Sequence, residues 1–272
     1  SRRACRVGRR SSIPIPAVRT ARPMTEPKVL PPVLLIGASS DIGMQLAREF
    51  ARAGHPLILT ARETEVLEPL ASDLSIRHSV AVQLVAIDVL HVPEARRTIA
   101  ALTPPPHIAV CLVGLLGDQQ QQQRDPDQAR IVIESNFTGP AAILEAVADV
   151  MAGIDAPTTI VGVSSVAGDR GRARNYYYGA AKAGFSAFLS GLRQRLTRSQ
   201  TTVITVKPGF VNTRMTAGMD LPPALTASDI ACARLIKRAI DRRQLVVYPW
   251  QWRVIMTVVK LLPEEIFKRL QF

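Results

Sequence analysis

The sequence predicts an α/β protein of the Rossmann type, a doubly wound parallel sheet in a single domain, followed by a C-terminal apolar helical tail. Three observations predict this fold: short apolar runs alternate with helical stretches, a glycine-rich turn follows the first run, and the last residues form an apolar helix pattern. With 272 residues, 47% hydrophobic and 21% charged, the chain can fill one core. We expect an arm over residues 1–23, the domain over 24–248 and the tail over 249–272.

Seven runs are expected as strands, and segments with helical apolar spacing separate them. In chain order the runs are VLLIG, PLILTA, AVQLVAI, HIAVCLV, TTIVGVS, TTVITVKP and QLVVYP. Such alternation is typical of a parallel sheet covered on both faces, which binds ligands at the carboxyl ends of its strands. The glutamine run 119–123 is expected as an exposed loop or a frayed helix start.

The arm carries most of the excess positive charge. Residues 1–23 hold seven arginines and no acid, so the remaining residues carry +5 of the net +12. Several prolines and the lack of an apolar core predict a disordered arm. It is either an Arg- and Ser-rich targeting peptide or, as we expect, sequence upstream of a start at Met24. Charge placed there does not indicate a nucleic-acid partner.

The cysteines and histidines form no metal pattern. Cys5, Cys111 and Cys232 lack metal-ligand spacing, and the four histidines are scattered. Isolated cysteines in odd number give no disulfide framework and suit a reducing compartment. We therefore expect a cytoplasmic protein without a bound metal.

The first expected strand runs directly into GASSDIG, residues 37–43, which opens a helical segment. Such a turn offers unpaired backbone N–H groups and a positive dipole end to a pyrophosphate, although taken alone it could be a plain strand-to-helix turn. The cofactor contacts expected from it are Gly37, Ser39, Ser40, Asp41, Ile42 and Gly43.

The second expected strand ends in Ala61 and Arg62, where an acidic residue would hold a free ribose 2′-hydroxyl. Without that carboxylate, and with a guanidinium available for a 2′-phosphate, the sequence favours NADP(H) over NAD(H). Arg62 could instead pair with Glu63 or Glu65 at the surface. Asp88 ends the third strand and is placed either to accept from an adenine amino group or to cap a helix.

Tyr178 and Lys182 are candidate catalytic residues. Four positions apart on a helix they share a face, whereas Tyr176 and Tyr177 point elsewhere. A fixed cation beside the phenol is expected to lower its pKa towards a range useful for proton transfer. Ser165 ends the run TTIVGVSS, from which a loop could carry its hydroxyl to the same substrate oxygen.

These features, with Asn136 in the next long helix and the later PGFVNT, resemble the short-chain dehydrogenase/reductase family over roughly residues 30–248. The resemblance implies that Tyr178 donates or accepts a proton and that Ser165 positions and polarises the carbonyl. It implies that Lys182 binds the nicotinamide ribose and tunes the tyrosine, and that Asn136 supports a proton-relay water. Members are usually dimers or tetramers, so a homo-oligomer is expected. The remaining cofactor contacts it implies are Val89, Gly114, Tyr178, Lys182, Pro208, Gly209, Val211 and Thr213.

Two departures from the family pattern affect the cofactor side. Asp41 stands where the family has the middle glycine of the phosphate turn, and its carboxylate could weaken cofactor binding unless it points away. The Asn-Asn-Ala-Gly after the fourth strand is replaced by CLVG, in which only Gly114 remains. Other contacts must therefore brace that part of the sheet.

A narrower resemblance rests on LLGDQ, VAGDRGRARNYYYGAAK, KPGFVNTRMT and the tail VVYPWQWRVIMTVVKLLPEEIFKRL. Together they look like the decaprenylphosphoryl-2-keto-β-D-erythro-pentose reductase branch. It implies reduction of the 2-keto group of a polyprenyl-phosphate-linked pentose in cell-wall precursor synthesis. The alternatives are a reductase of another carbonyl, fatty-acyl or small ketone, and a non-catalytic nucleotide-binding scaffold or redox sensor.

The tail contains one narrow polar stripe, Arg253, Thr257 and Lys260, on an otherwise apolar helix pattern. A helix this apolar must be buried somewhere, and twelve residues are too few to span a bilayer. We expect it either to pack against the core or a subunit partner, or to lie peripherally at the inner face of the membrane and contact a polyprenyl chain.

Overall fold

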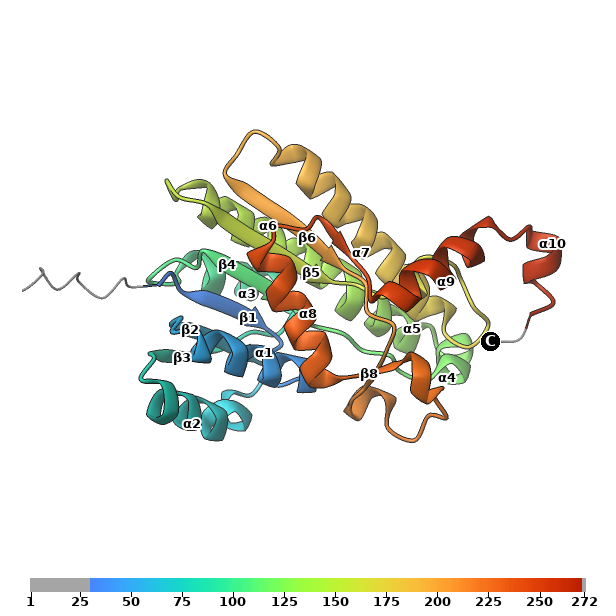
Figure 1. The fold of residues 1–272 in the computed structure, drawn as a ribbon, viewed down its shortest axis with the longest axis horizontal. Helices are drawn as coiled ribbons and strands as arrows, with labels where there is room; N and C mark the ends of the chain where they lie inside the picture. Colours follow the sequence, from blue (N-terminus) through green and yellow to red (C-terminus); the bar gives the residue numbers. More distant parts are fainter. Residues whose placement is uncertain (1–29, 271–272) are drawn as a thin grey trace, which may run out of the picture.

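A parallel seven-stranded sheet runs through the middle of the molecule (Figure 1). The computed structural model describes residues 30–270, so the predicted arm lies outside the described residues. The strands are β1 (Val33–Ile36), β2 (Leu57–Ala61), β3 (Val82–Ala86), β4 (Ile108–Cys111), β5 (Thr158–Val163), β6 (Thr201–Val206) and β9 (Val246–Val247). Their order is β3-β2-β1-β4-β5-β6-β9. The predicted doubly wound sheet is confirmed, and its strands fall in the seven predicted runs.

Helices cover both faces because successive side chains of a strand point to opposite sides. Val33 and Leu35 pack in one apolar cluster with α1 (Asp41–Arg52), α2 (Glu68–His78) and α8 (Asp229–Asp241). Leu34 and Ile36 pack in another with α3 (Val92–Ala100), α6 (Gly139–Ala152) and α7 (Tyr176–Arg195). Each βα unit therefore crosses from the sheet to a helix layer and back.

The strand order reverses beside β1, which has β2 on one side and β4 on the other. Open α/β sheets bind ligands at this point, outside the carboxyl ends of the strands. The candidate residues at the ends of β1, β2 and β4 consequently meet at one edge of the sheet. The shorter elements that surround this edge are η1 (Thr64–Leu67), α4 (Gln119–Arg124), α5 (Pro126–Ile133), η2 (Glu134–Thr138), η3 (Val166–Gly168), β7 (Phe210–Asn212), η4 (Arg214–Thr216), η5 (Pro223–Leu225) and β8 (Thr226–Ser228).

The glutamine run forms the short helix α4, whose first turn is capped by the Asp118 side chain accepting from the Gln121 N–H (2.9 Å). Gln122 is buried and donates to the Leu116 carbonyl (3.0 Å). The helix start that was expected as one alternative is therefore confirmed, and the expected exposure is wrong at Gln122, because its amide fills space beside the loop that follows β4.

One apolar helical run, Pro126–Ala152, joins α5, the π-helical η2 and α6. Its length and composition would allow it to cross a membrane, but 61% of its most apolar window is buried inside the fold. The α6 part packs on the sheet with α3 and α7. It is a core helix of the α/β domain.

The tail forms α9 (Trp250–Leu261) and α10 (Glu264–Phe267), which lie at one end of the molecule (Figure 1). Trp252 and Met256 on α9 are buried against Val166. The opposite apolar stripe of α9 is exposed: Trp250, Val254, Val258 and Leu261. The predicted burial of the tail is therefore confirmed for one face only.

Candidate cofactor cleft and catalytic residues

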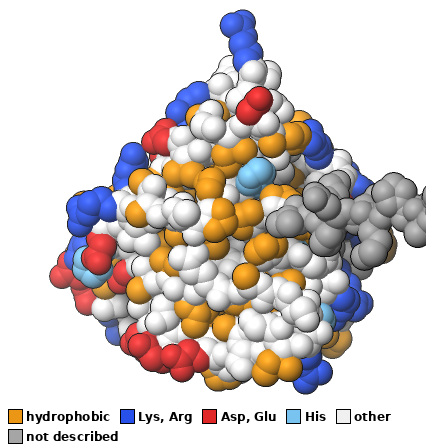
Figure 2. Space-filling view, turned by 90° about the vertical axis from the view of Figure 1, so that its left-hand side faces the viewer, with side chains coloured by type: hydrophobic (Ala, Val, Ile, Leu, Met, Phe, Trp, Pro, Cys, Tyr) orange, Lys and Arg blue, Asp and Glu red, His pale blue; other side chains and the backbone are white. Residues whose placement is uncertain are grey.

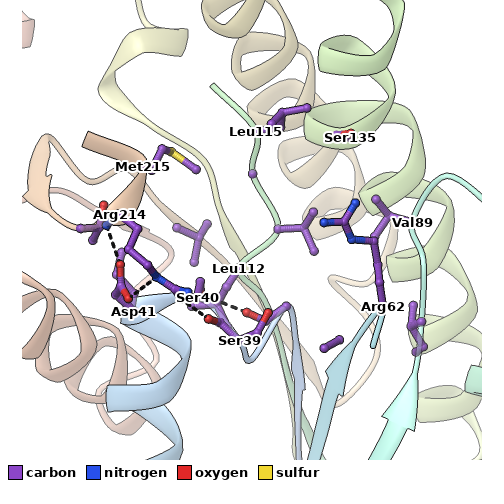
Figure 3. Close-up of a pocket in the computed structure, with 18 of the residues that line it drawn as sticks. Ser39, Ser40, Asp41, Arg62, Val89, Leu112, Leu115, Ser135, Arg214 and Met215 are labelled. Atoms are coloured by element: carbon purple, nitrogen blue, oxygen red, sulfur yellow. Dashed lines mark hydrogen bonds and ion pairs between the residues drawn. The ribbon is translucent and has the colours of Figure 1, made fainter. Parts of the chain in front are cut away.

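A cavity of about 430 Å³ opens at the carboxyl edge of the sheet, where β1, β2 and β4 end (Figure 3). The predicted cofactor residues that line it are Gly37, Ser39, Ser40, Asp41, Ile42, Arg62, Asp88, Val89, Gly114 and Thr213. The lining residues that the sequence did not indicate include Leu112, Val113, Leu115, Ser135, Arg214 and Met215. The cavity therefore combines the phosphate turn with an apolar wall from the loop after β4.

The turn after β1 is held in shape by glycines and by a serine cap. Gly37 has a φ of +83°, and a Cβ there would lie 3.1 Å from Val113 Cγ2. The Ser40 hydroxyl accepts from the Gly43 N–H (3.1 Å) and donates to the Gly37 carbonyl (2.9 Å). A Cβ at Gly43 would lie 2.8 Å from Ser40 Oγ. Gly43 thus permits the cap instead of lining the cavity.

Asp41 is the first residue of α1, and its carboxylate is paired with Arg214. The Arg214 Nε lies 2.8 Å from Asp41 Oδ1, and the Arg214 backbone N–H donates to Asp41 Oδ2 (2.7 Å). The charge that was expected to weaken cofactor binding therefore faces a guanidinium at the edge of the cavity.

Arg62 lies at the junction of the main cavity with a second one of about 250 Å³. Ser39, Ala61 and Arg214 also line this second cavity. Within residues 30–270, no ion pair joins Arg62 to a neighbouring glutamate, so the predicted alternative of a surface pair is wrong. The guanidinium points into the space beside Val89 in Figure 3.

Asp88 caps a turn and not a helix. Its Oδ1 accepts from the Leu90 N–H (2.9 Å), and Oδ2 lies 3.4 Å from His91 Nδ1. Helix α3 begins only at Val92, with His91 at its N-cap. The helix-cap alternative is therefore wrong, while the side chain lines the cavity as the cofactor interpretation requires.

Lys182 is buried beneath Tyr178 on the same face of α7, as their spacing predicted. Its Nζ donates to the carbonyls of Val113 (3.2 Å) and Val163 (3.2 Å), at the carboxyl ends of β4 and β5. The same Nζ lies 5.7 Å from the centroid of the Tyr178 ring. The two carbonyls fix the ammonium between the sheet and the phenol.

Burial raises the pKa of Tyr178 to about 12, and an interaction with the Ser165 side chain lowers it in part. Burial also lowers the pKa of Lys182 to about 8. The expectation that Lys182 sets the tyrosine's pKa low is therefore wrong in this structure. Desolvation of the phenol outweighs the Ser165 hydrogen bond, and the hydrogen bonds of the Lys182 ammonium go to backbone carbonyls instead of the phenol.

Two adjacent serines at the end of β5 have different tasks. Ser165 Oγ accepts from the Ala167 N–H (3.1 Å) at the start of η3, which holds the hydroxyl at the loop entrance. Ser164 Oγ donates to the Lys182 carbonyl (2.9 Å) and thereby ties β5 to α7. The sequence indicated Ser165 but not this support.

Asn136 lies in the π-helical η2 and is fully buried. Its Nδ2 donates to the carbonyls of Leu115 (2.7 Å) and Val132 (2.8 Å), and its Oδ1 accepts from the Leu115 N–H (3.1 Å). A Cβ at Gly114 would lie 3.4 Å from that oxygen and 3.6 Å from Lys182 Nζ. Asn136 thus braces the loop after β4 where the family motif is missing, and its part in a proton relay stays a prediction.

The segment PGF is covered by the tail. A Cβ at Gly209 would lie 1.9 Å from Trp252 Nε1, and the Phe210 and Trp252 rings meet edge to face at 5.1 Å. The Pro208 carbonyl accepts from the Val166 N–H (3.0 Å). Unlike Thr213, the predicted cofactor residues Pro208, Gly209, Val211, Tyr178 and Lys182 do not line the cavity, and the predicted catalytic residues Asn136 and Ser165 do not line it either.

The loop between Ser165 and α7 is tied to the tail by Arg170, which the sequence did not indicate. The Arg170 guanidinium donates to the carbonyls of Val259 (2.6 Å) and Leu262 (2.6 Å) and lies 3.9 Å from the Phe267 ring centroid. The same loop contains the buried Asp169, which pairs with Lys207 (2.5 Å) and accepts from Tyr248. The tail is thus tied to the loop that joins the candidate catalytic residue Ser165 to α7.

Basic side chains do not gather into one patch on the face of Figure 2, which is turned away from α9 and α10. Lys, Arg, Asp and Glu side chains are interspersed around its rim, with hydrophobic ones between them. Among residues 30–270, no group of three or more His, Cys, Asp and Glu residues could hold a metal ion.

Comparison with known proteins finds similar sequences that cover most of the chain. A family model described as short chain dehydrogenase matches residues 32–222. An uncharacterized oxidoreductase of Mycobacterium tuberculosis is 31% identical over 88% of this chain and 96% of its own length. A sulfoacetaldehyde reductase of Chromohalobacter salexigens is 33% identical over 73% of this chain and 84% of its own length.

Solved structures share the fold over nearly the whole described chain. A short-chain dehydrogenase from Sphingobium yanoikuyae in complex with NADPH has a TM-score of 0.72 and 26% identity, and covers 89% of this chain and 97% of its own. A short chain dehydrogenase from Burkholderia cenocepacia in complex with NADP has a TM-score of 0.77 at 20% identity, covering 90% and 98%. This second likeness concerns the fold alone.

Proposed function

Since the chain belongs to the short-chain dehydrogenase family, we propose that it is an NAD(P)H-dependent oxidoreductase that reduces a ketone. The observation that carries the proposal is the joint placement of Ser165, Tyr178 and Lys182 next to the cavity: Ser165 interacts with the Tyr178 side chain, and Lys182 donates to the carbonyls of Val113 and Val163, two residues that line the cavity. A nucleotide-binding scaffold would have no use for a partly buried phenol beside a fully buried ammonium at that place.

The chemistry of the cavity fits a dinucleotide. The turn at Gly37 leaves backbone exposed at the start of α1, where an anion is favoured. Asp88 and Val89 border the expected adenine side, and Gly114 lies next to Lys182. When bound, the reduced nicotinamide supplies the hydride for the carbonyl carbon.

Tyr178 is the proposed proton donor. Because burial raises its pKa to about 12, the phenol is neutral near pH 7 and holds the proton that the substrate oxygen needs. The Ser165 hydroxyl donates to that same oxygen and stabilises the charge that develops on it. Lys182 holds a cation between two carbonyls below the phenol, which favours proton release as the oxygen takes up the proton.

Preference for NADP(H) is the finer part of the proposal. Its support is the absence of a carboxylate at Ala61, together with Arg62 and the adjoining cavity of about 250 Å³. A guanidinium without an ion pair within residues 30–270 is suited to a phosphate. One relative of known structure was solved with NADPH.

Fluorescence titration with NADPH and, separately, NADH tests this proposal. Binding of NADPH in clear preference to NADH supports the assignment of Arg62. Equal binding would refute the NADP(H) preference while leaving the reductase assignment in place. Failure of both cofactors to bind would remove the enzyme proposal and favour a scaffold.

For the substrate, we propose the 2-keto group of a polyprenyl-phosphate-linked pentose, as the narrower resemblance implies. The exposed apolar stripe of α9 supports it, because Arg253 and Lys260 flank that stripe and suit an anionic lipid surface. The protein would then work in the cytoplasm at the inner face of the membrane. A second copy covering the stripe in a homo-oligomer is the competing arrangement.

A small anionic carbonyl is the second candidate substrate, since a sulfoacetaldehyde reductase is 33% identical to this chain. Parallel assays of NADPH oxidation with a lipid-linked 2-ketopentose, a fatty-acyl ketone and sulfoacetaldehyde distinguish the substrate classes. Turnover of sulfoacetaldehyde alone would exclude the lipid-linked sugar.

A further inference from the structure

Asp41 places a negative charge at a position that a dinucleotide's phosphates need. It is the first residue of α1 and lines the cavity, where the helix dipole and free N–H groups favour an anion. Its side chain is only 18% exposed, so solvent screens the carboxylate incompletely. An uncompensated carboxylate there would repel a diphosphate at the same helix end.

Arg214 compensates that charge from a distant part of the chain. Its guanidinium Nε lies 2.8 Å from Asp41 Oδ1, and its backbone N–H donates to Oδ2 (2.7 Å), across 173 residues of sequence. Its Nη2 also donates to the carbonyl of Ser39, inside the phosphate turn. Figure 3 shows the side chain laid along the turn at the rim of the cavity.

We propose that Arg214 is a positioning residue for cofactor binding: it neutralises Asp41 and holds its carboxylate away, so that the diphosphate common to NADPH and NADH can occupy the turn. This inference rests on the proposed function. It gives Arg214 a role different from that of Arg62, which is proposed to bind only the 2′-phosphate. Arg214 also ties η4, a wall of the cleft, to the turn after β1.

The test is a double-mutant cycle with Arg214→Gln, Asp41→Asn and the double variant, each titrated with NADPH and NADH by fluorescence. Arg214→Gln is expected to weaken both cofactors ~3- to 10-fold, in keeping with the modest strength of a partly exposed ion pair. Added salt should shrink this loss, because it screens the freed carboxylate. The double variant should bind both cofactors nearly as well as the wild type.

Two controls keep the cycle interpretable. Arg62→Gln removes a cation from the same cavity and is expected to weaken NADPH alone. Thermal unfolding of each variant without cofactor shows whether the fold is intact.

The inference is overturned if Arg214→Gln binds both cofactors like the wild type, or if the double variant stays as weak as Arg214→Gln. The second result would mean that the lost contact to Ser39, and not the bared carboxylate, weakens binding. A wild-type protein that binds neither cofactor would instead remove the proposed function on which the inference rests.

Discussion

Tyr178 and Lys182 share one face of α7, but their pKa values shift in opposite directions. Burial destabilises the charged form of each, so the phenol keeps its proton and the ammonium loses its own more readily. The spacing of four residues predicted that the two side chains share a helix face, because helix geometry is local. The direction of the tyrosine's pKa was not predictable, since desolvation depends on the packing of distant segments around it.

Replacing Tyr178 by Phe removes the proposed proton donor while keeping the ring. We expect turnover to fall by at least roughly 100-fold, as for loss of a general acid, with cofactor affinity nearly unchanged. Stopped-flow turnover and a cofactor titration measure the two effects. Tyr177→Phe is the matched control and should keep most activity, because the neighbouring ring points to another side of α7. Undiminished turnover of Tyr178→Phe would refute the assignment.

Replacing Lys182 by Met tests the burial of the ammonium through pH. The folded protein has a Lys182 pKa of about 8 against about 10.4 unfolded, so below pH 8 the buried charge destabilises the fold. Between these values the folded state loses its proton first and the penalty disappears. The wild type should therefore gain up to about 3 kcal/mol relative to Lys182→Met as pH rises through this window.

Urea unfolding of the wild type and of Lys182→Met, at several pH values from about 7 to about 10, measures that gain. Comparing the two proteins cancels the titration of the other groups. A difference in unfolding free energy that stays constant with pH would show that the ammonium is hydrated in the folded protein.

At the scale of elements, the sequence indicated every strand of the main sheet and the turn after β1, because each depends on local apolar runs, glycine and helix caps. It did not indicate which elements touch at the carboxyl edge. Arg170 binds the end of α9, and Trp252 covers Gly209, through contacts between segments far apart in sequence. The loop after β4, which lacks the Asn-Asn motif, is likewise held from a distant segment, because the Asn136 amide bonds the backbone of Leu115.

Gly209→Ala tests how closely the tail packs on PGF. The added methyl group would lie 1.9 Å from the Trp252 indole nitrogen, so the variant must shift α9. We expect it to lower the free energy of unfolding by about 1–3 kcal/mol and to make α9 more susceptible to proteolysis. Calorimetry and limited proteolysis measure these changes.

Gly191→Ala is the matched control, since nothing lies within 4 Å of a Cβ at this exposed position of α7. It should stabilise the protein by about 0.5–1 kcal/mol. Equal stability of Gly209→Ala and the wild type would mean that the indole does not rest on the glycine in solution.

For the molecule as a whole, the sequence predicted one α/β domain with its site at the carboxyl edge, and the tail as an apolar helix. Both are local or topological consequences of the apolar pattern. The sequence did not predict which face of α9 stays exposed, because the polar stripe Arg253, Thr257 and Lys260 is flanked by apolar residues on both sides. Packing against Val166, Gly209 and Phe210 is what places Trp252 inside and leaves Trp250 outside.

Two partners could cover the exposed apolar stripe of α9: a membrane surface or a second subunit. If α9 lies on a membrane, the protein should sediment with vesicles containing anionic lipid, and the double variant Val254→Ser and Val258→Ser should bind them several-fold more weakly, because two apolar contacts with the lipid are lost. Ile76→Ser on α2, equally apolar and 79% exposed, should leave vesicle binding unchanged. Light scattering of the same variants reports the competing arrangement. If the wild type is an oligomer that does not bind vesicles, and the double variant is a monomer, the stripe is a subunit interface. The lipid-linked substrate then loses its structural support.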